Sequence, residues 1–271
     1  MTAKKAGIKI IAEALKIAIN AIFGKMGGEH EWFYDLEALY KVTINGQLFL
    51  LMLIERLTEA GIDVFYGNTD GITSIVKLEQ EEEFYRICKE WEEELHLELE
   101  YVEIEKMMLR DVNNYTLRTT SGYIKEKGDF LRNPPLGKNV DARIVAKATH
   151  EWFYNGTPIG DTILNEKNLF QFMMTGKVGD QFDAVAHTLT EGELVEIPLQ
   201  HVNRYYAAKD QGAVTLLKKR KKDNGFENLL NLSQVYICND YKNPLIPINH
   251  DYYINRTRRL LASFETQQKL F

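Results

Sequence analysis

The stretch Tyr66-Gly67-Asn68-Thr69-Asp70-Gly71 is a turn sequence between two runs rich in β-branched residues, Ile62-Asp63-Val64-Phe65 and Ile72-Thr73-Ser74-Ile75-Val76. Glycine, asparagine and aspartate favour tight turns, whereas β-branched residues favour strands. The sequence therefore predicts a β-hairpin with an amide and a carboxylate at its tip. A carboxylate held on such a turn is suited to bind a divalent metal ion. The alternative interpretation is an ordinary Asx-turn in a surface hairpin.

Helical patterns flank this hairpin in the sequence. Apolar residues recur at spacings of three and four through residues 4–25, which predicts a helix that ends near Gly24. A second helix is predicted over residues 36–60, with Gly61 as its stop, and a third over 81–95. Strands are predicted over 97–102, 114–118 and 123–125, further helices over 141–154, 166–175 and 251–268, and short strands with loops over 195–237.

Composition and charge place the chain among globular proteins. It has 271 residues, 45% of them hydrophobic, which allows one large domain or two small ones. Its apolar runs are too short to span a bilayer and no signal peptide opens it, so we expect a cytoplasmic protein without membrane contact. The net charge is −6, with acid concentrated over 79–105 and base over 218–222. The acidic run is interpreted as a solvated face, and the basic run is either a solvated face or a DNA-binding one.

A second group of candidate residues lies on the first predicted helix. Lys16, Asn20, Phe23 and Gly24 are spaced so that all of them share one face of that helix. A lysine there can contact a triphosphate, an aromatic ring can pack against a sugar or base, and a glycine allows close approach. By itself this pattern also arises by chance.

In their order and separation, these two groups resemble motifs B and C of family B DNA polymerases, phage members included. The family carries Lys-x-x-x-Asn-Ser-x-Tyr-Gly on a fingers helix, where this chain has Lys16-Ile17-Ala18-Ile19-Asn20-Ala21-Ile22-Phe23-Gly24. It carries Tyr-Gly-Asp-Thr-Asp-Ser on a palm hairpin, where this chain has Tyr66 to Gly71. Lys125-Glu126-Lys127-Gly128 resembles the Lys-x-Lys-Gly turn that follows, and Val202-Asn203-Arg204-Tyr205-Tyr206 resembles a thumb feature.

The resemblance implies an α+β fold, in which an antiparallel palm sheet with helices is preceded by a fingers helix and followed by a mixed thumb lobe. We expect residues 1–28 to form the fingers helix, 29–135 the palm with its motif C hairpin, and 136–271 the thumb and C-terminal region. The break between palm and thumb is placed at Asn133-Pro134-Pro135-Leu136-Gly137, because this composition interrupts both helices and strands.

The resemblance also assigns roles to individual residues. Asp70 would be the metal ligand and, with Asn68, would occupy the catalytic positions of motif C. The cofactor would be Mg²⁺ or Mn²⁺, and the other partners primer-template DNA and a deoxynucleoside triphosphate. The nucleotide-binding residues would be Lys16, Asn20, Phe23, Gly24, Tyr66 and Thr69, and the DNA-binding residues Lys125, Lys127, Arg204, Lys218, Lys219 and Arg220.

Four departures from the family pattern shape the functional expectation. Asn68 replaces the first motif C aspartate, Ala21 and Phe23 replace serine and tyrosine, and Asn113-Asn114 stands where lysine and arginine are expected. The segment Asp-x-x-Ser-Leu-Tyr-Pro-Ser (motif A) and an exonuclease sequence are both absent. One aspartate cannot hold two metal ions alone, so the second carboxylate must come from elsewhere.

We therefore expect the C-terminal part of a DNA-directed DNA polymerase, either a truncated product or a subunit of a split enzyme. It would work with a second chain or a missing segment that carries motif A and the exonuclease, in a bacterial host cell if the gene belongs to a phage. One alternative is a non-catalytic nucleic-acid-binding module derived from a polymerase. Another is an unrelated interaction protein with chance motif matches.

Overall fold

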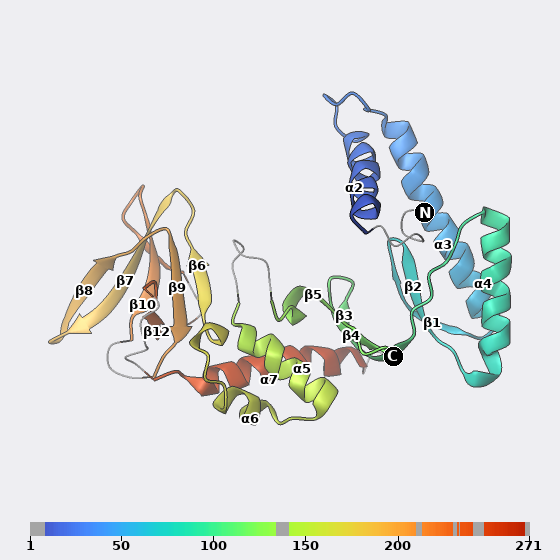
Figure 1. The fold of residues 1–271 in the computed structure, drawn as a ribbon. Coiled ribbons are helices and arrows are strands. Elements are labelled where there is room, and N and C mark those ends of the chain that lie inside the picture. Colours follow the sequence, from blue (N-terminus) through green and yellow to red (C-terminus); the bar gives the residue numbers. More distant parts are fainter. Residues whose placement is uncertain are drawn as a thin grey trace. The chain divides into compact units, whose positions relative to one another are not determined.

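The computed structural model describes residues 9–133, 141–209, 213–229, 232, 234–240 and 247–268. The chain forms two compact units, Met1–Tyr101 and Val102–Phe271. Both units combine α-helices with small antiparallel sheets (Figure 1).

Within its described residues, 9–101, the first unit contains three α-helices and one hairpin. Helix α2 covers Lys9–Lys25, α3 covers Leu36–Glu59 and α4 covers Glu81–Leu95, while strands β1 (Asp63–Asn68) and β2 (Gly71–Ile75) lie between α3 and α4 in the chain. The side chain of Asp35 caps α3 by accepting a hydrogen bond of 2.9 Å from Ala38 N. The 3-10 helix η1 (Leu78–Gln80) leads from the hairpin into α4.

The core of the first unit gathers where α3, the hairpin and α4 meet. Its buried members include Leu53 and Leu57 from α3, Ile62 just before β1, and Trp91 from α4. The indole N–H of Trp91 donates to the carbonyl of Phe49 at 2.8 Å, so this aromatic side chain links α4 to α3. This core therefore fixes the base of the hairpin and leaves its tip in solvent.

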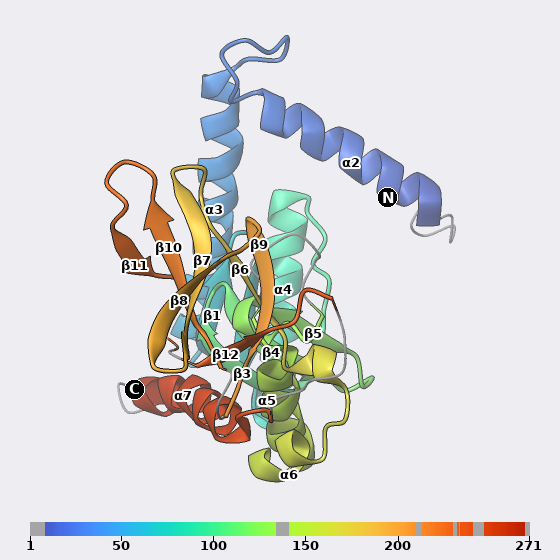
Figure 2. The ribbon, with the colours of Figure 1, turned by 90° about the vertical axis from the view of Figure 1, so that its left-hand side faces the viewer.

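The described residues of the second unit form three antiparallel sheets. The first joins β3 (Ile104–Asp111), β4 (Asn114–Thr119) and β5 (Ile124–Lys127). The second has the order β12-β9-β6, from Val235–Ile237, Val202–Ala207 and Met174–Lys177. The third has the order β11-β10-β7-β8, from Phe226–Asn228, Thr215–Arg220, Phe182–Thr190 and Glu193–Pro198 (Figure 2). Its helices are α5 (Arg143–Asn155), α6 (Ile159–Leu164) and α7 (His250–Gln268), with 3-10 turns η2 (Gly128–Phe130) and η3 (Leu169–Gln171).

The largest core of the molecule lies in this second unit. Tyr206 and Tyr253 are its largest fully buried side chains, and Phe172 packs edge-to-face on Tyr253 with ring centroids 5.2 Å apart. The hydroxyl of Tyr253 donates to Phe172 O at 2.8 Å and accepts from Ala207 N at 2.8 Å. One side chain of α7 therefore satisfies two backbone groups inside the core.

Two predicted elements are wrong. Residues 97–102 form no strand: α4 ends at His96 in the left-handed conformation (φ 54°), and Leu99 N then donates to the Glu92 carboxylate at 2.6 Å. Residues 166–175 form no continuous helix, because Asn168 accepts from Phe170 N at 3.0 Å and starts η3, after which β6 begins. In both places a local side-chain bond replaces the regular ladder.

The division between units also differs in position from the expected palm–thumb break. The compact units separate between Tyr101 and Val102, whereas the break was expected at 133–137, where residues 134–140 lie outside the described residues. The assignment of fingers, palm and thumb remains a prediction.

His150 on α5 makes the stability of the second unit depend on pH. Its side chain is buried, its Nε2 contacts Phe130 O at 3.0 Å, and its Nδ1 has no hydrogen-bond partner among the described residues. Burial, reinforced by the nearby Arg132 guanidinium, lowers the His150 pKa from 6.5, although the carboxylates of Glu126 and Glu151 oppose this shift. The imidazole ring of His150 is therefore neutral in the folded protein.

We expect the free energy of unfolding to fall by about 1 kcal/mol when the pH is lowered from 7.5 to 5.5. The reason is that the histidine of the unfolded chain binds a proton in this range, whereas the buried ring does not. Above the pKa that His150 has in the unfolded chain, the neutral buried ring makes its full contribution to stability. This contribution decreases as the pH falls toward the lower pKa that His150 has in the folded chain. Urea unfolding at the two pH values measures the change, with His150→Gln as the comparison. If the variant kept the whole pH dependence, another group would be responsible.

Candidate functional site

The hairpin predicted from residues 66–71 is present, and its geometry is regular at the tip. Asn68 pairs with Gly71, so Thr69 and Asp70 are the two residues of the turn. The ladder has one irregularity between Val64 and Tyr66, which places Phe65 outside the regular pairing. Strand residues such as Val64 pack on the core of the first unit. The turn is thus a short projection on an anchored base.

Asp70 has the environment of a possible ligand. It is exposed, and among the described residues it has no hydrogen bond or ion pair. Asn68 is used differently, because its Oδ1 accepts from Thr69 N at 2.8 Å and from Thr69 Oγ1 at 3.1 Å. The Asn68 amide therefore stabilises the turn through its contacts with Thr69. The hydroxyl of Tyr66 is shielded from solvent.

Among the described residues, Asp70 is a single candidate ligand and no complete metal site is formed. No three side chains of histidine, cysteine, aspartate or glutamate come together within the described parts of the chain. Mg²⁺ is held by oxygen ligands, often one or two carboxylates completed by substrate and water. Asp70 fits as one such ligand, while the carbonyl oxygen of Asn68 is already engaged within the turn.

Four of the six predicted nucleotide-binding residues lie on α2, where they are open to solvent, and the other two, Tyr66 and Thr69, belong to the hairpin. Lys16, Asn20, Phe23 and Gly24 are all exposed, and a side chain added at Gly24 would meet nothing within 4 Å. Within the described residues no hydrogen bond or ion pair joins Lys16 to Asp70. The structure therefore makes the α2 face accessible without bringing it into direct contact with the turn.

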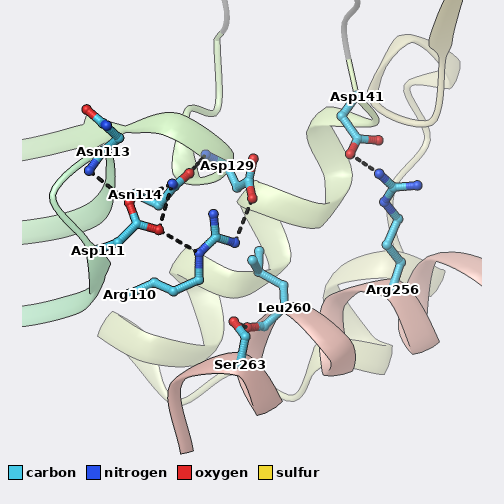
Figure 3. A network of polar contacts seen from close by, with 9 residues as sticks. All are labelled: Arg110, Asp111, Asn113, Asn114, Asp129, Asp141, Arg256, Leu260 and Ser263. Carbon is cyan, nitrogen blue, oxygen red and sulfur yellow. Dashed lines mark hydrogen bonds and ion pairs between the residues drawn. The ribbon is translucent and has the colours of Figure 1, made fainter. Parts of the chain in front are cut away.

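A polar network fills the turn between β3 and β4, the segment that resembles the polymerase primer region (Figure 3). The Asp111 carboxylate accepts from the Asn114 side chain at 2.8 and 2.9 Å, from Asn113 N at 2.9 Å and from the Arg110 guanidinium at 3.2 Å. These donors, the Asn114 amide foremost, lower the pKa of Asp111. Asn114 Oδ1 also accepts from Asp129 N at 3.0 Å.

This network gives Asn113 and Asn114 structural roles in the turn. Gly128 has φ +66°, and a side chain there would collide with Asn114 Oδ1 and Asn113 O. Arg110 extends the network through a 2.7 Å bond to Asp129. Asn113 and Asn114 are thus turn residues with structural partners, and the sequence carried a signal for this in the Asp111-Val112-Asn113-Asn114 turn composition.

Lys125 and Lys127 lie on β5, beside the same turn. Both ammonium groups are positioned over the ring of Tyr115, at 5.8 and 5.9 Å from its centroid. Lys127 Nζ also donates to Val112 O at 3.1 Å, so it is partly committed to the turn, whereas Lys125 is exposed. Of the two, Lys125 is the more available to a phosphate.

The basic run of β10 is neutralised by neighbouring carboxylates, which the sequence alone did not indicate. Lys218 pairs with Glu227 at 2.8 Å, and Lys219 pairs with Glu196 at 2.8 Å. Arg220 contacts Glu227 at 2.8 Å as well as Asp223 at 3.0 Å, and these bonds lower the pKa of both acids. The strand therefore presents compensated charge rather than a free cationic patch.

Arg204, the remaining predicted DNA contact, lies on β9 with an exposed side chain. Its backbone N–H donates to the Asn239 side chain at 2.8 Å. Its neighbours Tyr205 and Tyr206 are buried in the core, so they are not available to stack on bases.

Comparison with known proteins finds similarity to DNA polymerases over part of the chain. Over 69 residues it is 33% identical to DNA polymerase II of Escherichia coli (strain K12), a match that covers 26% of this chain and 9% of that protein. Over 87 residues it is 33% identical to DNA polymerase 2 of Aeropyrum pernix, covering 32% of this chain and 10% of the relative. No family model matches the chain. The chain thus spans about a tenth of the length of these curated relatives.

Proposed function

We propose that this chain is the C-terminal part of a DNA-directed DNA polymerase and that it contributes Asp70 to a metal centre completed by another polypeptide segment. The partial similarity to DNA polymerases supports the general class. The observation that carries the proposal is the exposed Asp70 carboxylate, unpaired among the described residues, on a two-residue turn between paired strands. The anchored turn fixes the position of this carboxylate, which stays available to a metal ion because it forms no ion pair among the described residues.

In this proposal α2 supplies the nucleotide contacts. Lys16 would bind the triphosphate as a point charge, while Asn20 and Phe23 would line the incoming base pair. Their exposure on one helix face supports this role, because a substrate could reach all of them together.

Mg²⁺ or Mn²⁺ would be bound by Asp70 together with carboxylates from the missing segment. When bound, a pair of such ions assists nucleotidyl transfer by activating the attacking oxygen and stabilising the leaving group. This chain's own part is to hold one carboxylate at a defined position. Asn68 keeps that turn closed and lowers the negative charge beside it.

Reconstitution of primer extension tests the proposal. The chain is mixed with primed DNA, deoxynucleoside triphosphates, Mg²⁺ and the upstream polypeptide, by which we mean a separately expressed chain that carries the Asp-x-x-Ser-Leu-Tyr-Pro-Ser segment. We expect extension in the mixture and none with either chain alone. Formation of a stable complex that remains inactive would contradict the proposal.

The second candidate function is a non-catalytic nucleic-acid-binding module. Asn68 in place of an aspartate, and the absence of a three-ligand cluster among the described residues, favour it. Mn²⁺ titration distinguishes the two, because a scaffold would show no binding that depends on Asp70. A DNA affinity that does not vary with salt would argue instead for an unrelated interaction protein.

If β10 contacts DNA, its carboxylate partners should weaken that contact. Glu227→Gln would release Lys218 and leave Arg220 paired with Asp223 alone, so we expect tighter DNA binding and a salt dependence steeper by about 0.9 for each additional phosphate contacted. Binding to a duplex measured by fluorescence anisotropy between about 50 and 200 mM salt checks this.

The matched control is Glu193→Gln on β8, which removes one charge from an exposed residue that forms no ion pair among those described. An equal increase in DNA affinity for both variants would mean that net charge alone causes the effect. No change for Glu227→Gln would place β10 away from DNA. Charge reversal at Lys218, Lys219 and Arg220 should weaken binding for the same reason.

A further inference from the structure

Helix α2 carries a row of apolar side chains that nothing in the described chain covers. We call these four residues the α2 stripe, and their spacings of four, four and three residues place them on one side of the helix. Between 47% and 65% of each side chain is exposed. The members of the α2 stripe are Ile11, Leu15, Ile19 and Ile22.

Helix α3 carries a second row with the same spacings, which we call the α3 stripe. Its side chains are 47–58% exposed. They lie on the opposite side of α3 from Leu53 and Leu57, which fill the core. Helix α3 therefore has two apolar sides, only one of which is packed. The members of the α3 stripe are Tyr40, Ile44, Leu48 and Leu51.

The two stripes are in register for antiparallel pairing. In an antiparallel pair of helices the residue numbers of facing residues have a nearly constant sum, because one chain ascends as the other descends. Matching the stripes from the loop outward gives pairs whose numbers add to 62 or 63 throughout. The pairs are Ile22 with Tyr40, Ile19 with Ile44, Leu15 with Leu48, and Ile11 with Leu51.

The loop between the helices already holds their ends together. Asp35 N, at the start of α3, donates to Met26 O at 3.0 Å, just after α2. Lys25 and Glu31 form an ion pair of 2.7 Å within the same loop. A rotation of α2 about this loop would therefore bring the stripes together without unfolding either helix.

We propose that α2 closes onto α3 as an antiparallel helical hairpin in which the α2 stripe packs against the α3 stripe. The four matched pairs would be removed from water, which is the driving force for closure. Lys16 and Asn20 lie about 125° around α2 from its stripe, so both remain accessible in the closed form. The inference rests on exposure and register, and does not depend on the proposed polymerase function.

Thiol crosslinking tests closure in the full chain. Ile19→Cys with Ile44→Cys joins a matched pair, and a short bismaleimide is the probe. We expect an intramolecular crosslink in the monomer, formed at least about tenfold faster than in the control, because pairing raises the local thiol concentration to the millimolar range. The native Cys88 and Cys238 are both buried, and the single-cysteine variants account for any reaction at them.

The matched control is Ile17→Cys with Ile44→Cys. Ile17 is 70% exposed and lies on the other side of α2, so its thiol is equally reachable but faces away from α3. Equal rates for the two variants would overturn the proposal. Crosslinks formed only between two chains would overturn it as well, since they would assign the stripes to a second copy.

Charges introduced at a second matched pair give an independent reading in the same crosslinking background. Leu15→Lys with Leu48→Lys should reduce the rate to that of the control, and Leu15→Glu with Leu48→Lys should restore it at low salt. If the crosslinking rate were the same for like and opposite charges, the proposed pairing of Leu15 with Leu48 would be wrong. Both positions are about half exposed, so the helices themselves should fold in each variant.

Discussion

Asparagine in place of Asp70 is expected to slow primer extension by the reconstituted mixture at least about 100-fold. Mutating a residue that only orients a metal ligand lowers metal affinity or activity about 10–100-fold, and mutating a direct ligand should lower it at least as much. The substitution keeps the size of the side chain and removes its charge. Because Asp70 is exposed and makes no bond among the described residues, the fold should be unaffected.

Asp63→Asn is the control for this experiment. It removes an exposed carboxylate from the same hairpin, at the far end of β1 from the turn. We expect its rate to stay within about twofold of wild type, since surface substitutions away from special features rarely matter. A similar loss in both variants would mean that hairpin charge, rather than a ligand at the turn, supports the reaction.

Phenylalanine in place of Tyr253 is expected to lower the free energy of unfolding of the second unit by roughly 2–4 kcal/mol. The ring would remain, but Ala207 N–H and Phe172 C=O would lose the hydroxyl that satisfies both. Each buried polar group left without a partner costs about 1–3 kcal/mol. Burial also raises the pKa of Tyr253, so this hydroxyl keeps its proton over the range used for unfolding.

Urea unfolding followed by circular dichroism measures this effect, and Tyr252→Phe provides the comparison. Tyr252 precedes Tyr253 on α7, is only half-buried, and accepts a 2.8 Å bond from Arg256 at the surface of the helix. We expect loss of the Tyr252 hydroxyl to lower the free energy of unfolding by about 1 kcal/mol or less. Equal effects would show that the two backbone bonds of Tyr253 contribute little.

Local patterns predicted the first unit well. The apolar period of α4 and the turn composition of the hairpin both gave bounds close to those observed, because each depends on residues near in sequence. Strand β3 was missed because the alternation at 97–102 indicated a strand several residues too early.

Pairings distant in sequence could not be read from these patterns. The carboxylates that neutralise β10 come from β8, β11 and the loop after β10, and the Glu196–Lys219 ion pair joins two strands that are separated by β7 in the sheet. Likewise, Gly128 is required beside Asn114 only once β4 and β5 are paired. The Nδ1 of His150, which has no hydrogen-bond partner in the described parts of the chain, is also a product of packing and not of sequence spacing.

The most direct test is Mn²⁺ binding, measured by electron paramagnetic resonance, to the chain, to the upstream polypeptide and to their mixture. We predict that the mixture binds Mn²⁺ at least about tenfold more tightly than either chain alone, and that Asp70→Asn removes this gain. Equal affinity in all three samples, or a gain that survives Asp70→Asn, would contradict the proposal that this turn supplies part of a shared metal centre.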